Sequence, residues 1–175
     1  MISPKAEIDP KAKIGKNVTI YPFAYIEGDV EIGDDCVIYP YVSIMNGTRL
    51  GRGNKVFQNT VLGAVPQDFN YKGDPSHLII GNGNIIRENV VINRATFSDG
   101  KTVIGNNNFL MEGVHVSHDT KIGKVRVRIW YEDCRRLRHR GCCDILFWRY
   151  SNPGARVGKA SMVQSGCRFS KDVPP

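Results

Sequence analysis

The feature that most constrains this chain is a six-residue repeat of branched apolar residues. From residue 2 to residue 122, 18 of the 21 positions spaced six apart hold Ile, Leu or Val, where an apolar content of 41% predicts about nine apolar residues of any kind. A second column, four residues after the first, holds small or compact residues. Its first members are Ala6, Ala12, Val18, Ala24, Val30, Cys36, Val42 and Thr48. Gly, Asn, Asp, Lys and Pro, which favour turns, lie between the two columns.

A period of six matches neither the 3.6-residue period of a helix nor the two-residue alternation of a long strand. Short strands separated by tight turns at fixed intervals are typical of a parallel β-helix, in which each coil stacks about 4.8 Å from the preceding one. We therefore predict an all-β solenoid without helices. Its end strands would be exposed, so a cap or an oligomer is expected.

The repeat is interrupted twice without losing its phase. Between Leu62 and Ile80 the register positions are Asp68 and Asp74, and charged side chains there cannot face the core. This predicts an outward loop at about residues 63–79. A smaller excursion is expected around Ser98, which is again polar at a register position. Loops that leave a rigid scaffold often carry binding groups.

Composition limits the remaining possibilities. No stretch of the 175-residue chain approaches the roughly 20 apolar residues that a membrane-spanning helix needs, and the start, MISPKAEIDP, lacks the apolar block of a signal peptide. We therefore expect a cytoplasmic protein without a membrane span. The five cysteines are odd in number and irregular in spacing, which fits a reducing compartment better than a disulfide framework.

The net charge of +7 is concentrated in one segment. Residues 125–151 hold seven arginines against three acidic residues, and the six-residue repeat stops there. The repeat resumes at Val157, Val163 and Phe169, but the interval from Ile122 to Val157 is one residue short of six hexads. Three interpretations compete: a basic insert that binds nucleic acid, a Cys/His metal site, and a stretch read in the wrong frame. The metal site would use Cys134, His139, Cys142 and Cys143.

The frame interpretation is favoured. Codons for residues 125–151 can be chosen so that the frame one nucleotide away encodes CVFGYGTKIAGDCVIEDAAIFSSGVI, which continues the six-residue repeat, and the loss of one codon explains the shortened interval. The basic charge is then no evidence for a nucleic-acid partner. We expect residues 1–124 to form a β-helix, residues 125–151 to be an aberrant segment, and residues 152–175 to be resumed coils.

Two groups of polar residues could carry chemistry. His115 and His118 lie three apart, and Asp119 follows the second; a His beside a carboxylate can act as a general base. Since Val116 is the inward position, His118 is expected on a turn or outer surface, where an ordinary solvated His is the simpler interpretation. The outward loop offers Gln67, Asp68, Asn70, Tyr71 and Lys72, which suit sugar or nucleotide hydroxyls but also an ordinary solvated loop.

A resemblance bears on both groups. The hexad array is followed in order by PQDFNYKGDP, IIRENVVINRATFSDG, NNFLMEGVHVSHDTKIG and VQSGCRFSKDVPP. Over residues 1–124 and 152–175 these motifs resemble the acyl-[acyl-carrier-protein]–UDP-N-acetylglucosamine O-acyltransferase family. The resemblance implies a left-handed β-helix, a homotrimer with active sites between neighbouring subunits, and transfer of a 3-hydroxyacyl group to the glucosamine 3-hydroxyl in the first step of lipid A synthesis. In the family a helical domain follows the position where this sequence ends.

The resemblance also implies roles for individual residues. His118 would be the general base that takes the proton from the attacking hydroxyl, and Asp119 would orient it. Gln67 and Asp68 would hold the sugar, and His115 would line the acyl site. Further substrate-binding candidates are Tyr71, Lys72 and Arg94, and the region that sets acyl length contains Gln164, Ser165 and Gly166. Asn93 and Ala95 depart from the family's HRGT-like motif, so this sequence has no imidazole there for a substrate contact.

The resemblance also implies partners, and other functions remain as alternatives. No metal or cofactor is implied, and the acidic acyl carrier protein is expected to dock on Lys and Arg along the trimer edge. A different hexapeptide acyltransferase, acting on an amino sugar or using acetyl-CoA, shares the solenoid. A metal-dependent hydratase would need three imidazoles, and outside residues 125–151 only His77, His115 and His118 are present. A non-enzyme alternative is an inactive fragment of the family.

Overall fold

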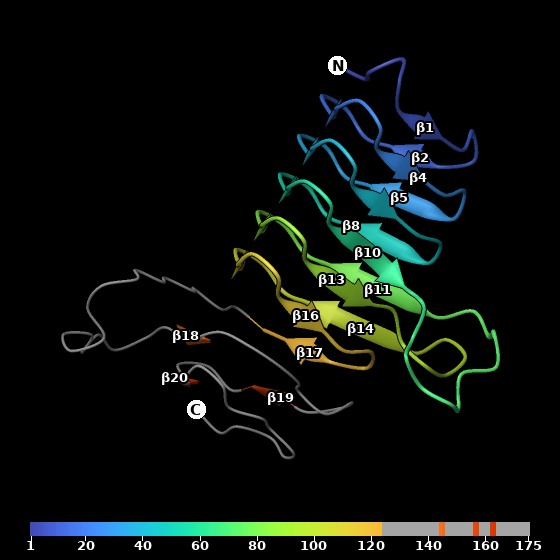
Figure 1. The fold of residues 1–175 in the computed structure, drawn as a ribbon, viewed down its shortest axis with the longest axis vertical. Helices are drawn as coiled ribbons and strands as arrows, with labels where there is room; N and C mark the ends of the chain where they lie inside the picture. The colour runs from blue at the N-terminus through green and yellow to red at the C-terminus, as the bar shows by residue number, and fades with distance from the viewer. Residues whose placement is uncertain (124–143, 146–155, 158–161, 164–175) are drawn as a thin grey trace.

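The computed structural model describes residues 1–123, 144–145, 156–157 and 162–163 (Figure 1). Within these ranges the chain forms short parallel strands joined by turns, and it forms no helix. Each coil contributes one strand to each of three sheets, so the coils stack into a three-sided prism. This confirms the predicted left-handed parallel β-helix of six-residue repeats.

We call the three sheets faces 1, 2 and 3. Face 1 consists of β1 (Glu7–Ile8), β4 (Tyr25–Ile26), β7 (Ser43–Ile44), β10 (Val61–Ala64), β13 (Val91–Asn93) and β16 (His115–Val116). Face 2 consists of β2 (Lys13–Ile14), β5 (Val30–Ile32), β8 (Thr48–Leu50), β11 (His77–Ile80), β14 (Lys101–Ile104), β17 (Lys121–Ile122) and β19 (Arg156–Val157). Face 3 consists of β3 (Thr19–Ile20), β6 (Val37–Ile38), β9 (Lys55–Val56), β12 (Ile85–Ile86) and β15 (Phe109–Leu110). In addition, β18 (Asp144–Ile145) pairs with β20 (Met162–Val163).

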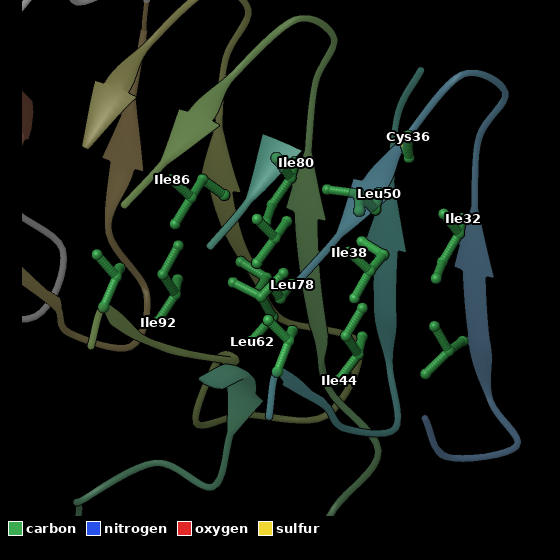
Figure 2. Packing of buried hydrophobic residues seen from close by; sticks show 14 of the residues in the cluster. Ile32, Cys36, Ile38, Ile44, Leu50, Leu62, Leu78, Ile80, Ile86 and Ile92 are labelled. Atoms are coloured by element: carbon green, nitrogen blue, oxygen red, sulfur yellow. The ribbon is translucent and has the colours of Figure 1, made fainter. Parts of the chain in front are cut away.

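The apolar column forms the core of the prism. Lys13 aligns with Glu31 on the next coil, so a regular coil consists of three hexads. From Ile20 to Ile122, every apolar member of the first column is buried, and Figure 2 shows several of these side chains stacked between the sheets. Stacking of equivalent positions places each side chain against the Ile, Leu or Val of the neighbouring coils, which removes apolar surface from water. Ile2 is 51% exposed, as expected for an end coil.

Most of the second column is also buried, and it holds more polar residues in the later coils. Asn54, Asn84 and Asn108 lie on successive coils, each no more than 2% exposed. The Nδ2 group of Asn84 donates to Oδ1 of Asn54 at 2.9 Å, and Nδ2 of Asn108 donates to Oδ1 of Asn84 at 2.9 Å. These hydrogen bonds form an asparagine ladder inside the solenoid, which satisfies amide groups that could not otherwise be buried.

Both interruptions of the repeat lie in coils that are longer than 18 residues. Val61 aligns with Val91, so this coil is longer than a regular one, and its additional residues are accommodated between β10 and β11. His77 aligns with Lys101, so the next coil is also lengthened, and its additional residues lie around Ser98. The first loop is narrower than the predicted range of 63–79, because β10 continues to Ala64 and β11 begins at His77. Pairing with the neighbouring coils extends both strands into the predicted range, and the loop itself comprises residues 65–76.

After Gly123 the structure describes only short strands, so the predicted repeat can be compared with the structure only there. Val157 aligns with Ile122 on face 2, and Val163 ends β20, so the repeat resumes in strands at two of the predicted positions. Phe169, the acyl-length residues 164–166 and nearly all of 125–151 lie outside the described residues. Within the described ranges, no helix has the length and apolarity to cross a membrane.

Candidate functional site

His118 lies in the turn between β16 and β17, but it is not on an outer surface. The expectation of a solvated side chain was wrong, since His118 is only 6% exposed. The cause is the outward loop, which places the Asp68 carboxylate 3.9 Å from Nε2 of His118. A segment from a much earlier part of the chain therefore covers the imidazole.

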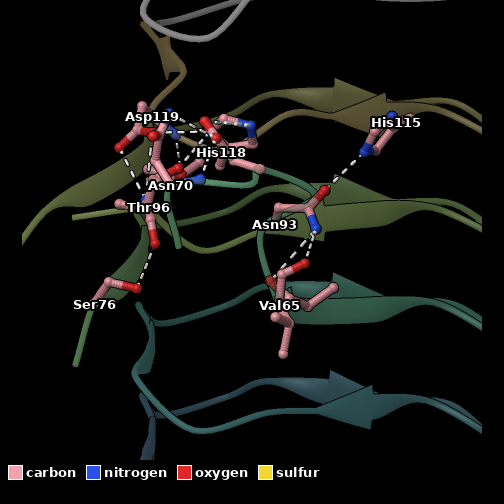
Figure 3. Close-up of polar contacts among 12 residues, drawn as sticks. Val65, Asn70, Ser76, Asn93, Thr96, His115, His118 and Asp119 are labelled. Carbon is pink, nitrogen blue, oxygen red and sulfur yellow. Dashed lines mark hydrogen bonds and ion pairs between the residues drawn. The ribbon is translucent and has the colours of Figure 1, made fainter. Parts of the chain in front are cut away.

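Two groups contact the other nitrogen of the imidazole. Nδ1 of His118 lies 2.9 Å from Oδ2 of Asp119 and 2.7 Å from Oγ1 of Thr96 (Figure 3). An ionised carboxylate can only accept a hydrogen bond, so the neutral ring carries its proton on Nδ1 and keeps the lone pair on Nε2. This is the tautomer that a general base needs if it is to act through Nε2.

Asp119 is itself held in place by backbone and hydroxyl groups. The backbone N–H of Thr96 donates to both carboxylate oxygens, at 3.2 and 3.3 Å, and the backbone N–H of Asp119 donates to Oγ1 of Thr102 at 2.9 Å. Asp119 has a φ of 61°, a left-handed conformation that Asp tolerates better than most residues. The turn thus directs the carboxylate toward the ring of the preceding residue.

Asp68 is ordered by its own loop. The backbone N–H and the Nδ2 group of Asn70 both donate to Oδ1 of Asp68, at 2.8 and 3.0 Å. The backbone N–H of Tyr71 donates to the Asp68 carbonyl at 3.1 Å. These contacts leave Oδ2 as the oxygen that faces His118. Asp68 can therefore accept a hydrogen bond from a substrate hydroxyl close to Nε2.

The other loop candidates are not brought to the imidazole by a described contact. Gln67 is exposed, and Nζ of Lys72 donates to the Phe69 carbonyl at 3.0 Å within the loop. Tyr71 and Arg94 contact each other, since Nη2 of Arg94 donates to the Tyr71 hydroxyl at 2.8 Å. The predicted set therefore divides into Asp68 beside His118, a Tyr71–Arg94 pair, and two exposed side chains.

His115 belongs to a neighbouring cluster on face 1. Nε2 of His115 lies 2.7 Å from Oδ1 of Asn93, and Nδ2 of Asn93 donates to the Val65 carbonyl at 2.6 Å (Figure 3). Because the Asn93 amide donates to Val65, its oxygen faces His115, so Nε2 of His115 is the donor. Burial lowers the pKa of His115, and nearby His118 lowers it further. His115 is therefore neutral near pH 7.

Sequence reasoning missed the residues that support the site. Thr96 and Thr102 belong to the second column, where the sequence indicated only small residues that fill space, and both are at most 1% exposed. Their column position could have marked them as buried hydroxyls, but the length of the excursion around Ser98 decides which turn they face. Among the described residues, no group of three or more His, Cys, Asp or Glu side chains is arranged to hold a metal ion.

Comparisons with known proteins agree on one kind of enzyme. A model of the bacterial transferase hexapeptide family (six repeats) matches residues 11–46. An acyl-[acyl-carrier-protein]–UDP-N-acetylglucosamine O-acyltransferase of Halorhodospira halophila is 44% identical over 181 residues, covering 99% of this chain and 68% of that protein. A protein of the same name from Saccharophagus degradans is 46% identical over 123 residues, covering 70% of this chain and 48% of that protein.

A solved structure extends this similarity to three dimensions. The crystal structure of a UDP-N-acetylglucosamine acyltransferase from Bacteroides fragilis has 42% sequence identity and a TM-score of 0.77, covering 99% of this chain and 69% of that one. The chain thus spans from about half to about two thirds of the length of these relatives.

Proposed function

Because this chain belongs to the acyl-[acyl-carrier-protein]–UDP-N-acetylglucosamine O-acyltransferase family, we propose that it transfers a 3-hydroxyacyl group from acyl carrier protein to the 3-hydroxyl of UDP-N-acetylglucosamine. This reaction is the first step of lipid A biosynthesis. The observation that carries the proposal is the buried imidazole of His118, with Asp119 at Nδ1 and Asp68 on the Nε2 side.

The arrangement supports base-catalysed acyl transfer. Nε2 of His118 takes the proton of the sugar hydroxyl while that oxygen attacks the thioester carbonyl, and Asp119 stabilises the imidazolium that forms. Collapse of the tetrahedral intermediate breaks the carbon–sulfur bond, and the imidazolium returns the proton to the thiolate. Base, nucleophile and leaving group therefore account for every proton in the proposed reaction.

Substrate placement follows from the positions around His118. Asp68 accepts a hydrogen bond from the sugar, and Gln67 and Lys72, on the same loop, contact the sugar nucleotide from its exposed side. Neutral His115 lines the acyl site on face 1. We further propose that the chain forms a homotrimer in the cytoplasm, and that acidic acyl carrier protein docks on Lys and Arg along the trimer edge. Gln164, Ser165 and Gly166 set acyl length in this proposal.

The test is transfer of a labelled 3-hydroxyacyl group to UDP-N-acetylglucosamine, measured with this chain and with a chain in which the reading frame of residues 125–151 is restored. We expect acylated sugar nucleotide from the restored chain when acyl carrier protein is the donor. If acetyl-CoA serves at least as well as donor, the chain is a different hexapeptide acyltransferase. If the chain as it stands transfers the group robustly, it is not an inactive fragment.

A further inference from the structure

The guanidinium of half-buried Arg94 makes three hydrogen bonds to its own chain. Nη1 donates to the Gly63 carbonyl at 3.2 Å and to the Asn46 carbonyl at 3.4 Å, while Nη2 donates to the Tyr71 hydroxyl at 2.8 Å. The guanidinium also lies over the Tyr71 ring, 5.7 Å from its centre. The backbone N–H of Arg94 donates to the Ala64 carbonyl at 3.0 Å. These contacts use the planar fork of the guanidinium within the protein.

Three consecutive residues, 93–95, contact the outward loop at three points. Asn93 donates to the carbonyl of Val65 at the start of the loop, at 2.6 Å. Arg94 holds Tyr71 in its middle. The Ala95 carbonyl accepts a hydrogen bond from the Ser76 hydroxyl at its end. Of these three contacts, the one made by Arg94 involves Tyr71, whose backbone N–H donates to the Asp68 carbonyl.

A continuous series of contacts connects Arg94 to the imidazole. The Tyr71 hydroxyl accepts from Arg94, the Tyr71 backbone N–H donates to the Asp68 carbonyl at 3.1 Å, and the Asp68 carboxylate lies 3.9 Å from Nε2 of His118. The loop has no strand of its own between Val65 and Ser76, so its shape depends on such contacts.

We propose that Arg94 is a positioning residue, which holds Tyr71 and thereby keeps Asp68 beside His118, and that it does not contact the sugar nucleotide. The significance of Asp68 and His118 rests on the proposed function, but the positioning of the loop does not. Two measurements separate these two claims.

The first measurement is limited proteolysis by chymotrypsin at Phe69, whose side chain is 99% exposed on the loop. Arg94→Ala is expected to speed cleavage after Phe69 by about tenfold, since charge-assisted hydrogen bonds that hold the loop closed are lost. Tyr71→Phe keeps the ring but loses the hydroxyl, and is expected to speed cleavage about threefold. Arg94→Lys should not restore the slow rate, because an ammonium cannot reproduce the fork.

Arg52→Ala is the matched control, because Arg52 is an exposed arginine on a corner away from the loop. Mass spectrometry of the fragments identifies the cut, and the urea midpoint of each variant separates opening of the loop from global unfolding. If Arg94→Ala does not fold, Tyr71→Phe and Arg94→Lys carry the test. Cleavage after Phe69 at the same rate in all folded variants would overturn the proposal.

The second measurement is a double-mutant cycle on the Kd for UDP-N-acetylglucosamine. If Arg94 acts by holding the loop that carries Asp68, Arg94→Ala weakens binding in the wild-type background and weakens it less in Asp68→Ala. Fully additive losses would show that Arg94 does not act through Asp68 and would overturn the proposal. Absence of binding by the unaltered chain would contradict the proposed function instead, and the proteolysis rates would still decide the role of Arg94.

Discussion

Removal of one amide from the asparagine ladder tests how the interior of the solenoid is stabilised. In Asn84→Ala, Oδ1 of Asn54 loses the Nδ2 donor of Asn84 at 2.9 Å. The backbone N–H and the Nδ2 group of Asn108 lose their acceptor Oδ1, at 2.8 and 2.9 Å. Asn84 is fully buried, so water does not replace these bonds without opening the coil.

The magnitude follows from three lost hydrogen bonds. Each buried bond contributes about 1 kcal/mol net, so the free energy of unfolding should fall by about 3 kcal/mol. For a chain of this size, that change corresponds to a decrease of roughly 6–12 °C in Tm. Asn84→Asp should cost more, because its carboxylate would face Oδ1 of Asn54 with no donor between them.

The assay is urea unfolding followed by far-UV circular dichroism, with Asn106→Ala as the matched control. Asn106 is exposed, and its Oδ1 accepts one hydrogen bond, from the Asn82 N–H at 2.6 Å. The control should lose about 1 kcal/mol or less. Equal losses in Asn84→Ala and Asn106→Ala would contradict this prediction, because burial of the ladder would then add nothing.

Three other predictions concern separate parts of the chain. Burial raises the pKa of the Cys36 thiol, so iodoacetamide should leave Cys36 unmodified in the native state and alkylate it after unfolding, as peptide mass spectrometry would show; rapid native alkylation would contradict this. Because burial lowers the pKa of His115 from 6.5, the unfolded chain binds the proton first as the pH falls below 6.5, and stability is lost in that direction. His115→Gln should therefore flatten the dependence of the urea midpoint on pH over this range, and an unchanged slope would count against it. The DNA for residues 125–151, read one nucleotide displaced, should encode a six-residue repeat close to CVFGYGTKIAGDCVIEDAAIFSSGVI without stop codons; stops or unpatterned residues would reject the frame interpretation.

The fold could be predicted because its six-residue period is visible in the spacing of the apolar residues. An Ile every six positions has only one way to face a common interior when Gly, Asn and Asp separate the strands, and Ile38 aligns with Ile20 and Ile44 with Ile26 on neighbouring coils, as expected. The charged register positions Asp68 and Asp74 likewise indicated that the chain must leave the wall. These are local properties that need no knowledge of distant contacts.

The candidate site could be predicted only in part. Its geometry depends on the paths of two loops, the outward loop that carries Asp68 and the excursion around Ser98. His118 and Asp119 are adjacent in sequence, so their pairing was visible. The burial of His118 by Asp68 depends on the path of a loop that is distant in sequence, and Thr96 reaches Nδ1 only because the excursion around Ser98 lengthens the coil before β14. Neither path is encoded in a periodic pattern, so side-chain spacing alone placed His118 on the surface.

We propose that Nε2 of His118 is the base for acyl transfer. The kcat/KM of His118→Ala for the labelled 3-hydroxyacyl donor and UDP-N-acetylglucosamine tests this role. The measurement uses the frame-restored chain, with His77→Ala as a control, because His77 lies on β11 without a described contact to the imidazole. Loss of a positioned general base is expected to lower kcat/KM by about 10²–10⁴-fold, while the control retains its activity. A kcat/KM of His118→Ala within about twofold of the unaltered value would contradict this role, because loss of the general base should lower kcat/KM by about 10²-fold or more.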